Sequence, residues 1–135
     1  MSLFGAFNIS ASGIDAAQTW INTTAGNIAN ANDVAPVSGK AYQAQTPVYT
    51  PTTSLPDGSG DGVAVAGIDL GDSTGIVESD PTSPLANSQG LVRVPDVSMG
   101  QQLVNLVQAQ NDYQANTAAL ERAKTAYQAA LTLGQ

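Results

Sequence analysis

The chain of 135 residues contains neither cysteine nor histidine. These absences exclude disulfides, thiol chemistry, ordinary zinc sites and the most common general base. Charge is also scarce, because only 11% of the residues are charged, against about a quarter in an average protein. Four basic residues against eleven acidic ones give a net charge of −7, too few cations to follow a phosphate backbone or an anionic membrane. We therefore expect no cofactor, no metal and no nucleic-acid partner.

Long apolar runs and an early basic region are missing as well. No Lys or Arg precedes Lys40, and polar residues interrupt every apolar run before the ~18 residues that a membrane span needs. The sequence thus predicts neither a cleaved signal peptide nor direct insertion into a membrane. If the protein works outside the cytoplasm, we expect an export route that uses no conventional signal.

Residues that break helices are confined to the middle of the chain. All seven prolines lie between Pro36 and Pro95, together with eight of the thirteen glycines. We predict one structural unit made of an N-terminal helix over residues 1–32, a β-rich insert over 33–96 with a flexible loop near 51–62, and a long C-terminal helix over 97–135. The expected fold class is mainly α with a small β insert, in which the terminal helices pack as a coiled-coil-like hairpin.

Both terminal segments carry apolar side chains every seven residues, the period of a coiled coil. The first segment has Phe7, Ile14, Ile21 and Ile28 at this spacing. The second has Met99, Leu106, Tyr113, Leu120 and Tyr127, with Leu103 and Leu131 four residues after the first and last of these. We predict that these residues form a helix seam and subunit interface. Trp20 lies beside this seam, where we favour an interface role over a core role, and Asn116 is a candidate for a hydrogen bond between helices, although simple exposure fits nearly as well.

Local signals mark where the two helices begin and end. Ser98 and Gln101 have the spacing of a capping box just after Pro95, which predicts a helix start there. A helix from there to residue 133 would be about 50 Å long. We expect the first helix to stop near Asn30 to Asn32, because asparagine tolerates the left-handed conformation that ends many helices.

The middle segment contains four short stretches with strand character, separated by Gly, Pro and Asp. They cover residues 42–49, 63–70, 74–77 and 91–94. The whole segment 33–96 has eight acidic residues and two basic ones, a net charge of −6. We expect it to face solvent or a basic partner.

The terminal helices carry too few charges for a surface that faces water. Asp15 is the only charged residue before residue 33, whereas a solvated helix normally carries charges opposite its apolar face. An ordinary two-helix core under the insert would explain some of the seam residues. It would leave most of each helix in water, so we favour burial against neighbouring subunits and expect weakly ordered helices in the lone chain.

The sequence offers little evidence for a catalytic or metal-binding site. The acids Asp57, Asp61, Asp69 and Asp72 cluster in sequence, but only one copy of a calcium-repeat-like stretch exists. Glu78 and Asp80 could in principle act as the paired carboxylates of a hydrolase. We favour the alternative that they lie in a turn exposed to solvent. Serines are plentiful, yet no base is present to activate one. We predict that the protein is not an enzyme, with no catalytic residue.

Five stretches, in order along the chain, resemble the axial rod proteins of the bacterial flagellar basal body, and most closely the FlgC family of proximal rod proteins. They are MSLFGAFNISASGI (1–14), NIANA (27–31), GVAVAGI (62–68), DPTSPLANSQGLVRVPDV (80–97) and YQAN (113–116). NIAN and YQAN recur across rod and hook proteins, while the opening stretch and residues 80–97 discriminate better among them. Residues 33–39 and 51–62 match no family pattern.

This resemblance implies a structural subunit of the periplasm-spanning rod, which transmits torque to the hook for motility. It also implies export through the flagellar type III system, and partners that include copies of the chain, other rod proteins, the membrane-ring protein and the rod adaptor. A sister rod protein of the same family is the nearest alternative. Beyond that, a non-flagellar type III-secreted helical hairpin would lack the β insert.

Overall fold

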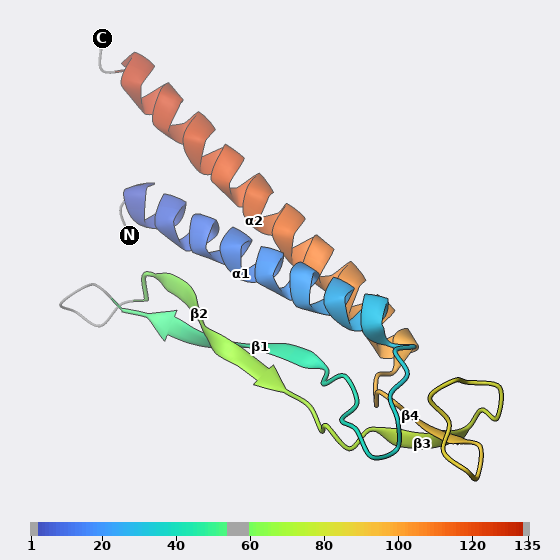
Figure 1. The fold of residues 1–135 in the computed structure, drawn as a ribbon. Coiled ribbons are helices and arrows are strands. Elements are labelled where there is room, and N and C mark those ends of the chain that lie inside the picture. The colour runs from blue at the N-terminus through green and yellow to red at the C-terminus, as the bar shows by residue number, and fades with distance from the viewer. Residues whose placement is uncertain (1–2, 54–59, 134–135) are drawn as a thin grey trace. The chain divides into compact units, whose positions relative to one another are not determined.

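The protein is described by a computed structural model over residues 3–53 and 60–133. Two long helices flank four short strands: α1 is Leu3–Asn30 and α2 is Met99–Leu133, and between them lie β1 (Gln45–Thr52), β2 (Gly62–Leu70), β3 (Ile76–Ser79) and β4 (Leu91–Val94) (Figure 1). The predicted fold class is therefore confirmed. The predicted flexible loop near 51–62 falls mostly on residues 54–59, which lie outside the described residues.

The strands form two separate two-stranded sheets, one of β1 and β2 and one of β3 and β4. The second is antiparallel, with Ile76 opposite Val94 and Ser79 opposite Leu91. Its ends need glycine, because Gly75 and Gly90 adopt positive φ angles of 52° and 73°. Such angles are costly for any residue with a Cβ.

Helix α2 begins as the sequence predicts, and α1 ends at Asn30, where its end was expected, but with a different backbone conformation. The Oγ of Ser98 accepts a hydrogen bond from the Gln101 N–H at 3.4 Å, which caps the first turn. The chain leaves α1 without a left-handed residue, because no described residue other than glycine has a positive φ. The expectation of a left-handed asparagine was wrong: the Asn30 side chain instead donates to the Gly26 carbonyl, and tight turns follow.

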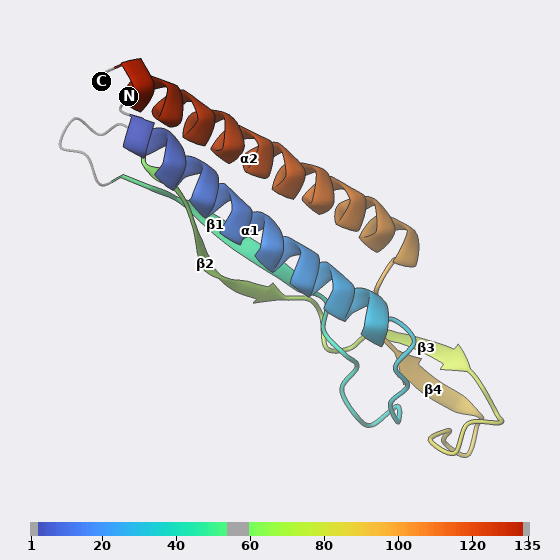
Figure 2. The ribbon, with the colours of Figure 1, turned by 90° about the horizontal axis from the view of Figure 1, so that it is seen from above.

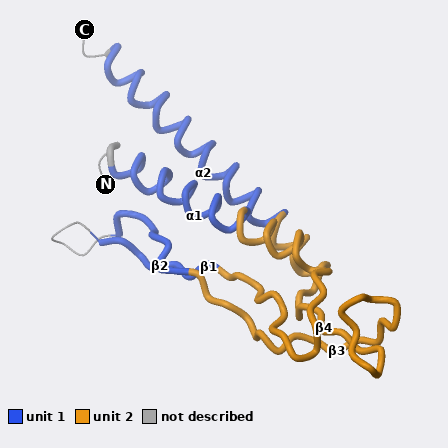
Figure 3. Tube along the Cα trace, viewed as in Figure 1, with its two compact units in different colours: residues 1–21, 47–67, 107–135 blue, residues 22–46, 68–106 orange. Residues whose placement is uncertain are grey.

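The chain divides into two compact units (Figure 3). Unit 1 contains Met1–Ile21, Pro47–Gly67 and Val107–Gln135, and unit 2 contains Asn22–Thr46 and Ile68–Leu106. Both helices pass through both units, so each unit holds a piece of α1 beside a piece of α2 (Figures 1 and 2). Neither helix, over its described residues, combines the length and apolar character required to cross a bilayer.

The buried side chains in both units are small, and several of them are polar. Ala16, Ala17 and Ala109 are buried in unit 1, and Ala41 and Val92 in unit 2. The buried polar residues are Ser10, Thr23, Thr24 and Asn27. Small side chains allow two helix backbones to approach closely, and the polar ones need hydrogen-bond partners inside the contact.

Candidate assembly surfaces

In unit 1, Gly13 of α1 faces the side chain of Asn116 of α2 at close range. A Cβ placed on Gly13 would lie 2.5 Å from the Oδ1 of Asn116, so any larger residue at position 13 would force the Asn116 side chain to move. The Asn116 side chain donates to the Asp112 carbonyl at 2.9 Å within its own helix. Asn116 therefore fills the space above Gly13, while its amide N–H bonds to a carbonyl of its own helix.

Hydrogen bonds from Val63 and Tyr49 connect the strands of unit 1 to α1. The Val63 N–H donates to the Ser12 Oγ at 3.1 Å, and the Tyr49 hydroxyl donates to the Ala16 carbonyl at 3.2 Å. Partial burial, with a smaller contribution from the negative charge of Asp112, raises the pKa of Tyr49 above its usual 10.0. The Tyr49 hydroxyl therefore keeps its proton, and can donate it, at neutral pH.

In unit 2, Asn27 joins α1 to α2 and to the strand region. Its side chain is 2% exposed. Its Nδ2 donates to the Gln45 carbonyl at 2.9 Å and to the Gln102 Oε1 at 3.1 Å, while its Oδ1 accepts from the Gln45 N–H at 2.8 Å and from the Tyr42 hydroxyl at 3.0 Å. All four hydrogen-bonding positions of this amide are used, which is what a buried asparagine requires.

The predicted seam residues fall into two groups by exposure. Those that are half-buried are Phe7, Ile14, Trp20, Ile21, Ile28, Leu106, Tyr113, Asn116 and Leu120. Those at the ends of α2 are exposed, namely Met99, Leu103, Tyr127 and Leu131. None of the thirteen is fully buried. The buried apolar positions of the two helices are occupied by small side chains such as Ala16, Ala17 and Ala109, whereas the large seam residues keep part of their surface exposed.

Apolar and uncharged surface remains open on the first turns of α2. Leu103, Val104 and Val107 are 50%, 60% and 58% exposed. No charged residue occurs in the helix before Asp112. Exposed apolar side chains on a helix segment without charges are typical of a surface that another protein covers.

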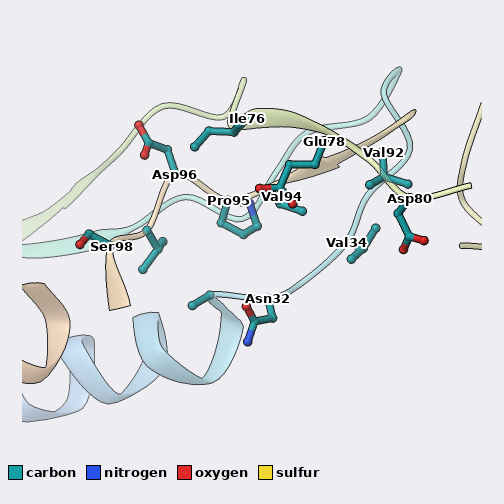
Figure 4. Close-up of a pocket in the computed structure, with 12 residues that line it drawn as sticks. Asn32, Val34, Ile76, Glu78, Asp80, Val92, Val94, Pro95, Asp96 and Ser98 are labelled. Carbon is teal, nitrogen blue, oxygen red and sulfur yellow. The ribbon is translucent and has the colours of Figure 1, made fainter. Parts of the chain in front are cut away.

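A groove of about 480 Å³ lies in unit 2 beside β3 and β4 (Figure 4). Apolar side chains of both strands and three carboxylates line it, and none of its lining residues is basic. Within residues 3–53 and 60–133, no group of three or more His, Cys, Asp or Glu residues has the geometry to hold a metal ion. The groove is thus lined by apolar and acidic side chains and by no basic one.

Sequence reasoning did not assign a role to Ser12 or Asn27, whereas Gly13 is one of the small residues expected to let helices approach closely. Ser12 lies in the opening stretch that resembles rod proteins, and Asn27 lies in NIANA. These residues could have been found because polar residues and glycine inside a long helix lower its stability. Their presence there therefore indicates a tertiary contact.

Comparison with known proteins gives matches over the whole length of the chain. The family model described as "Flagellar basal body rod FlgEFG protein C-terminal" matches residues 88–133. The chain is 35% identical to the flagellar basal-body rod protein FlgC of Yersinia enterocolitica, with 100% of both chains covered. The FlgC protein of Salmonella typhimurium is 33% identical, again over 100% of both chains. The chain belongs to the FlgC family of flagellar basal-body rod proteins.

FlgC membership confirms the predicted family and the absence of an enzymatic role. Members of the FlgC family are structural subunits of the basal-body rod and assemble with other rod subunits. The end-to-end match includes the strand region that a needle-type hairpin would lack. FlgC proteins from distant bacteria also match: that of Aquifex aeolicus is 30% identical over 95% of this chain and 94% of its own.

Proposed function

We propose that this rod subunit joins its neighbours through the flanks of α1 and α2, where the large seam residues lie. The observation that carries this proposal is that small and large residues of the helices differ in burial. Small residues such as Ala17 and Gly13 make the contact within the chain. Larger ones such as Ile14 and Leu120 stay half-buried and have apolar surface left for a second contact.

The scarcity of charge on both helices supports the same proposal. Asp15 is the only charged residue of α1, and α2 has none before Asp112. Burying an unpaired charge against a neighbour costs several kcal/mol (roughly), so a surface that is covered on assembly benefits from having none. Water would impose no such restriction on an outer helix face.

Further parts of the proposed role rest on family resemblance. In this role the subunits leave the cell through the flagellar type III export system, build the rod across the periplasm and transmit torque to the hook. Their neighbours are copies of the chain, other rod proteins, the membrane-ring protein and the rod adaptor. The few fully buried large side chains support passage in an unfolded state, since little apolar burial has to be undone.

Charge insertion on the seam tests the assembly surfaces. We expect Ile14→Asp or Leu120→Asp, placed in a strain from which the gene has been deleted, to abolish motility and intact rods in isolated basal bodies. Cellular protein levels should remain close to those of the parent chain. The reason is that an unpaired charge buried at a contact with a neighbour costs several kcal/mol (roughly).

Matched controls add charge to exposed positions of the same helices. Asn8→Asp lies seven residues before Asp15, and Gln114→Glu lies seven residues before Glu121, so each extends a face that already carries an acid. Both controls should support normal motility. Intact rods from Ile14→Asp and Leu120→Asp would show that the flanks of the hairpin are not the contact surface.

A further inference from the structure

The β3–β4 sheet has one covered edge and one open edge. The Asp80 N–H donates to the Gly90 carbonyl at 2.9 Å, in register with the pairs of Glu78 with Val92 and Ile76 with Val94. Because hydrogen-bonded pairs alternate in an antiparallel ladder, Val77 and Ser79 direct their backbone groups away from β4. On the far side of β4, Arg93 exchanges two backbone hydrogen bonds of 2.9 Å with Ala35.

The open edge belongs to an exposed strand. All four residues of β3 are exposed, including Ile76 at 46% and Val77 at 47%. Over the part of the chain that the structure describes, β3 pairs with β4 alone. Two-stranded sheets are marginal by themselves, and free edges with apolar side chains invite a further strand.

The groove of Figure 4 adjoins this edge and combines an apolar floor with negative charge. Ile76 and Glu78 from β3 line it together with Val92 and Val94 from β4. Val92 is 1% exposed and forms part of the floor. The carboxylates of Glu78, Asp80 and Asp96 lie among the lining residues, and no basic side chain does.

We propose that the β3 edge and this groove bind an extended, basic segment of another protein, which adds to the sheet as a third strand. Its backbone pairs with Val77 and Ser79. On the groove side, a Lys or Arg meets the carboxylates of Glu78 and Asp80, and a neighbouring apolar side chain covers Ile76. Backbone pairing supplies affinity in such complexes, and the alternate side chains supply specificity.

A second copy of the chain does not have the chemistry of this occupant. Each copy carries only four basic residues and a net charge of −7. The Arg93 guanidinium already donates hydrogen bonds to the carbonyls of Val37 and Thr74. Arg122 and Lys124 lie within α2, where the backbone is not available for strand pairing. The fourth basic residue, Lys40, is exposed but isolated, and the N–H of the adjacent Ala41 already donates to the Ser73 carbonyl. The charge of the groove therefore favours a different, basic protein, and this inference does not depend on the helix flanks proposed above.

Binding of a simple peptide to the full-length chain tests the proposal. The probe is a fluorescent peptide of alternating lysine and valine, followed by anisotropy, with a glutamate-for-lysine peptide as comparison. We expect only the basic peptide to bind, with affinity that falls as salt rises, and amide NMR shifts at Val77 and Ser79. A basic peptide with N-methylated backbone should lose at least about tenfold in affinity, because it cannot complete the ladder.

Paired variants separate the groove from the overall charge. Glu78→Gln with Asp80→Asn should weaken binding about tenfold, whereas Asp69→Asn with Glu121→Gln removes the same charge elsewhere and should change binding less than twofold. Circular dichroism checks that both variants fold. The proposal is overturned if the basic peptide does not bind, if both pairs weaken binding equally, or if the N-methylated peptide binds as well. It is also overturned if the chain without peptide associates with itself through Val77 and Ser79.

Discussion

At the scale of single residues, two asparagines and one glycine determine how α1 meets α2. Asn27 is buried with four hydrogen bonds in unit 2, and Asn116 covers Gly13 in unit 1. Glycine inside a helix costs about 0.5–1 kcal/mol relative to alanine, so its presence at position 13 calls for a physical reason. The close approach of the Asn116 amide supplies that reason.

A double-mutant cycle tests this contact. Gly13→Ala alone should destabilise the chain by about 1 kcal/mol, because the added methyl forces the Asn116 side chain to move. In an Asn116→Ala background the space is free, and the same change should stabilise by about 0.5–1 kcal/mol through helix propensity. Urea unfolding followed by circular dichroism measures both. An equal effect of Gly13→Ala in the two backgrounds would contradict the contact.

Removal of the Asn27 amide should be far more damaging than removal of an exposed one. Asn27→Ala leaves the Gln45 N–H and the Gln102 side chain without their partner, and we expect a loss of about 2–3 kcal/mol in unfolding free energy. Asn111→Ala, on the exposed side of α2, serves as the control and should change stability by less than about 0.5 kcal/mol. Similar losses in the two variants would argue against the role of Asn27.

At the scale of elements, α2 depends on its cap and on contacts along its length. Its first turn is closed by Ser98, whose Oγ accepts from Gln101 while its carbonyl accepts from the Gln102 N–H at 3.0 Å. Only half of the predicted capping box forms in this way, since the Gln101 Nε2 donates to Asn105 Oδ1 instead. The helix start is thus local in origin, as the sequence indicated.

Removal of this cap should shorten α2 from its beginning. Ser98→Ala should cost about 0.5–1 kcal/mol, at the lower end because the 3.4 Å bond is long. Amide hydrogen exchange should increase at Gln101 and Gln102 and remain unchanged in the second half of the helix. Ser38→Ala, in an exposed turn, provides the comparison. Unchanged exchange at Gln101 in Ser98→Ala would show that the first turn is held by other contacts.

At the scale of the whole molecule, the chain has little fully buried apolar surface. Over the described residues, Val92 is the largest apolar side chain that is fully buried, and most of the other buried ones are alanines. Burial of side chains this small supplies limited free energy, which must offset the ordering of two long helices. Neighbouring rod subunits would supply the missing burial.

The isolated chain should therefore be only marginally stable. We expect an unfolding free energy at or below about 5 kcal/mol in urea, and correspondingly weak protection of the helix amides from exchange at low protein concentration. Conditions that drive association should slow this exchange. A lone chain with an unfolding free energy well above about 10 kcal/mol, and no tendency to associate, would contradict the idea that assembly completes the fold.

The sequence predicted the elements better than the faces they present. Proline placement and the seven-residue period were sufficient for the two helices, and turn residues were sufficient for four strands within a few residues. The face of each helix that meets its partner was harder to derive, because residues such as Ala17 and Asn27 are neither large nor apolar enough to mark a core. A low-charge helix offers little contrast between its sides, so periodicity alone does not distinguish the inner face from its flanks.

The hydrogen bonds of Asn27 have a mechanical consequence for the helix pair of this rod subunit. A seam of alanines would allow one helix to slide along the other by a full turn, about 5.4 Å, with little change in contact. Asn27 prevents such slippage, because a shift of that size would break its bonds to both Gln45 and Gln102 at once. Within unit 2 this side chain thereby fixes the axial register of α1 against α2, as the Asn116 side chain above Gly13 does within unit 1.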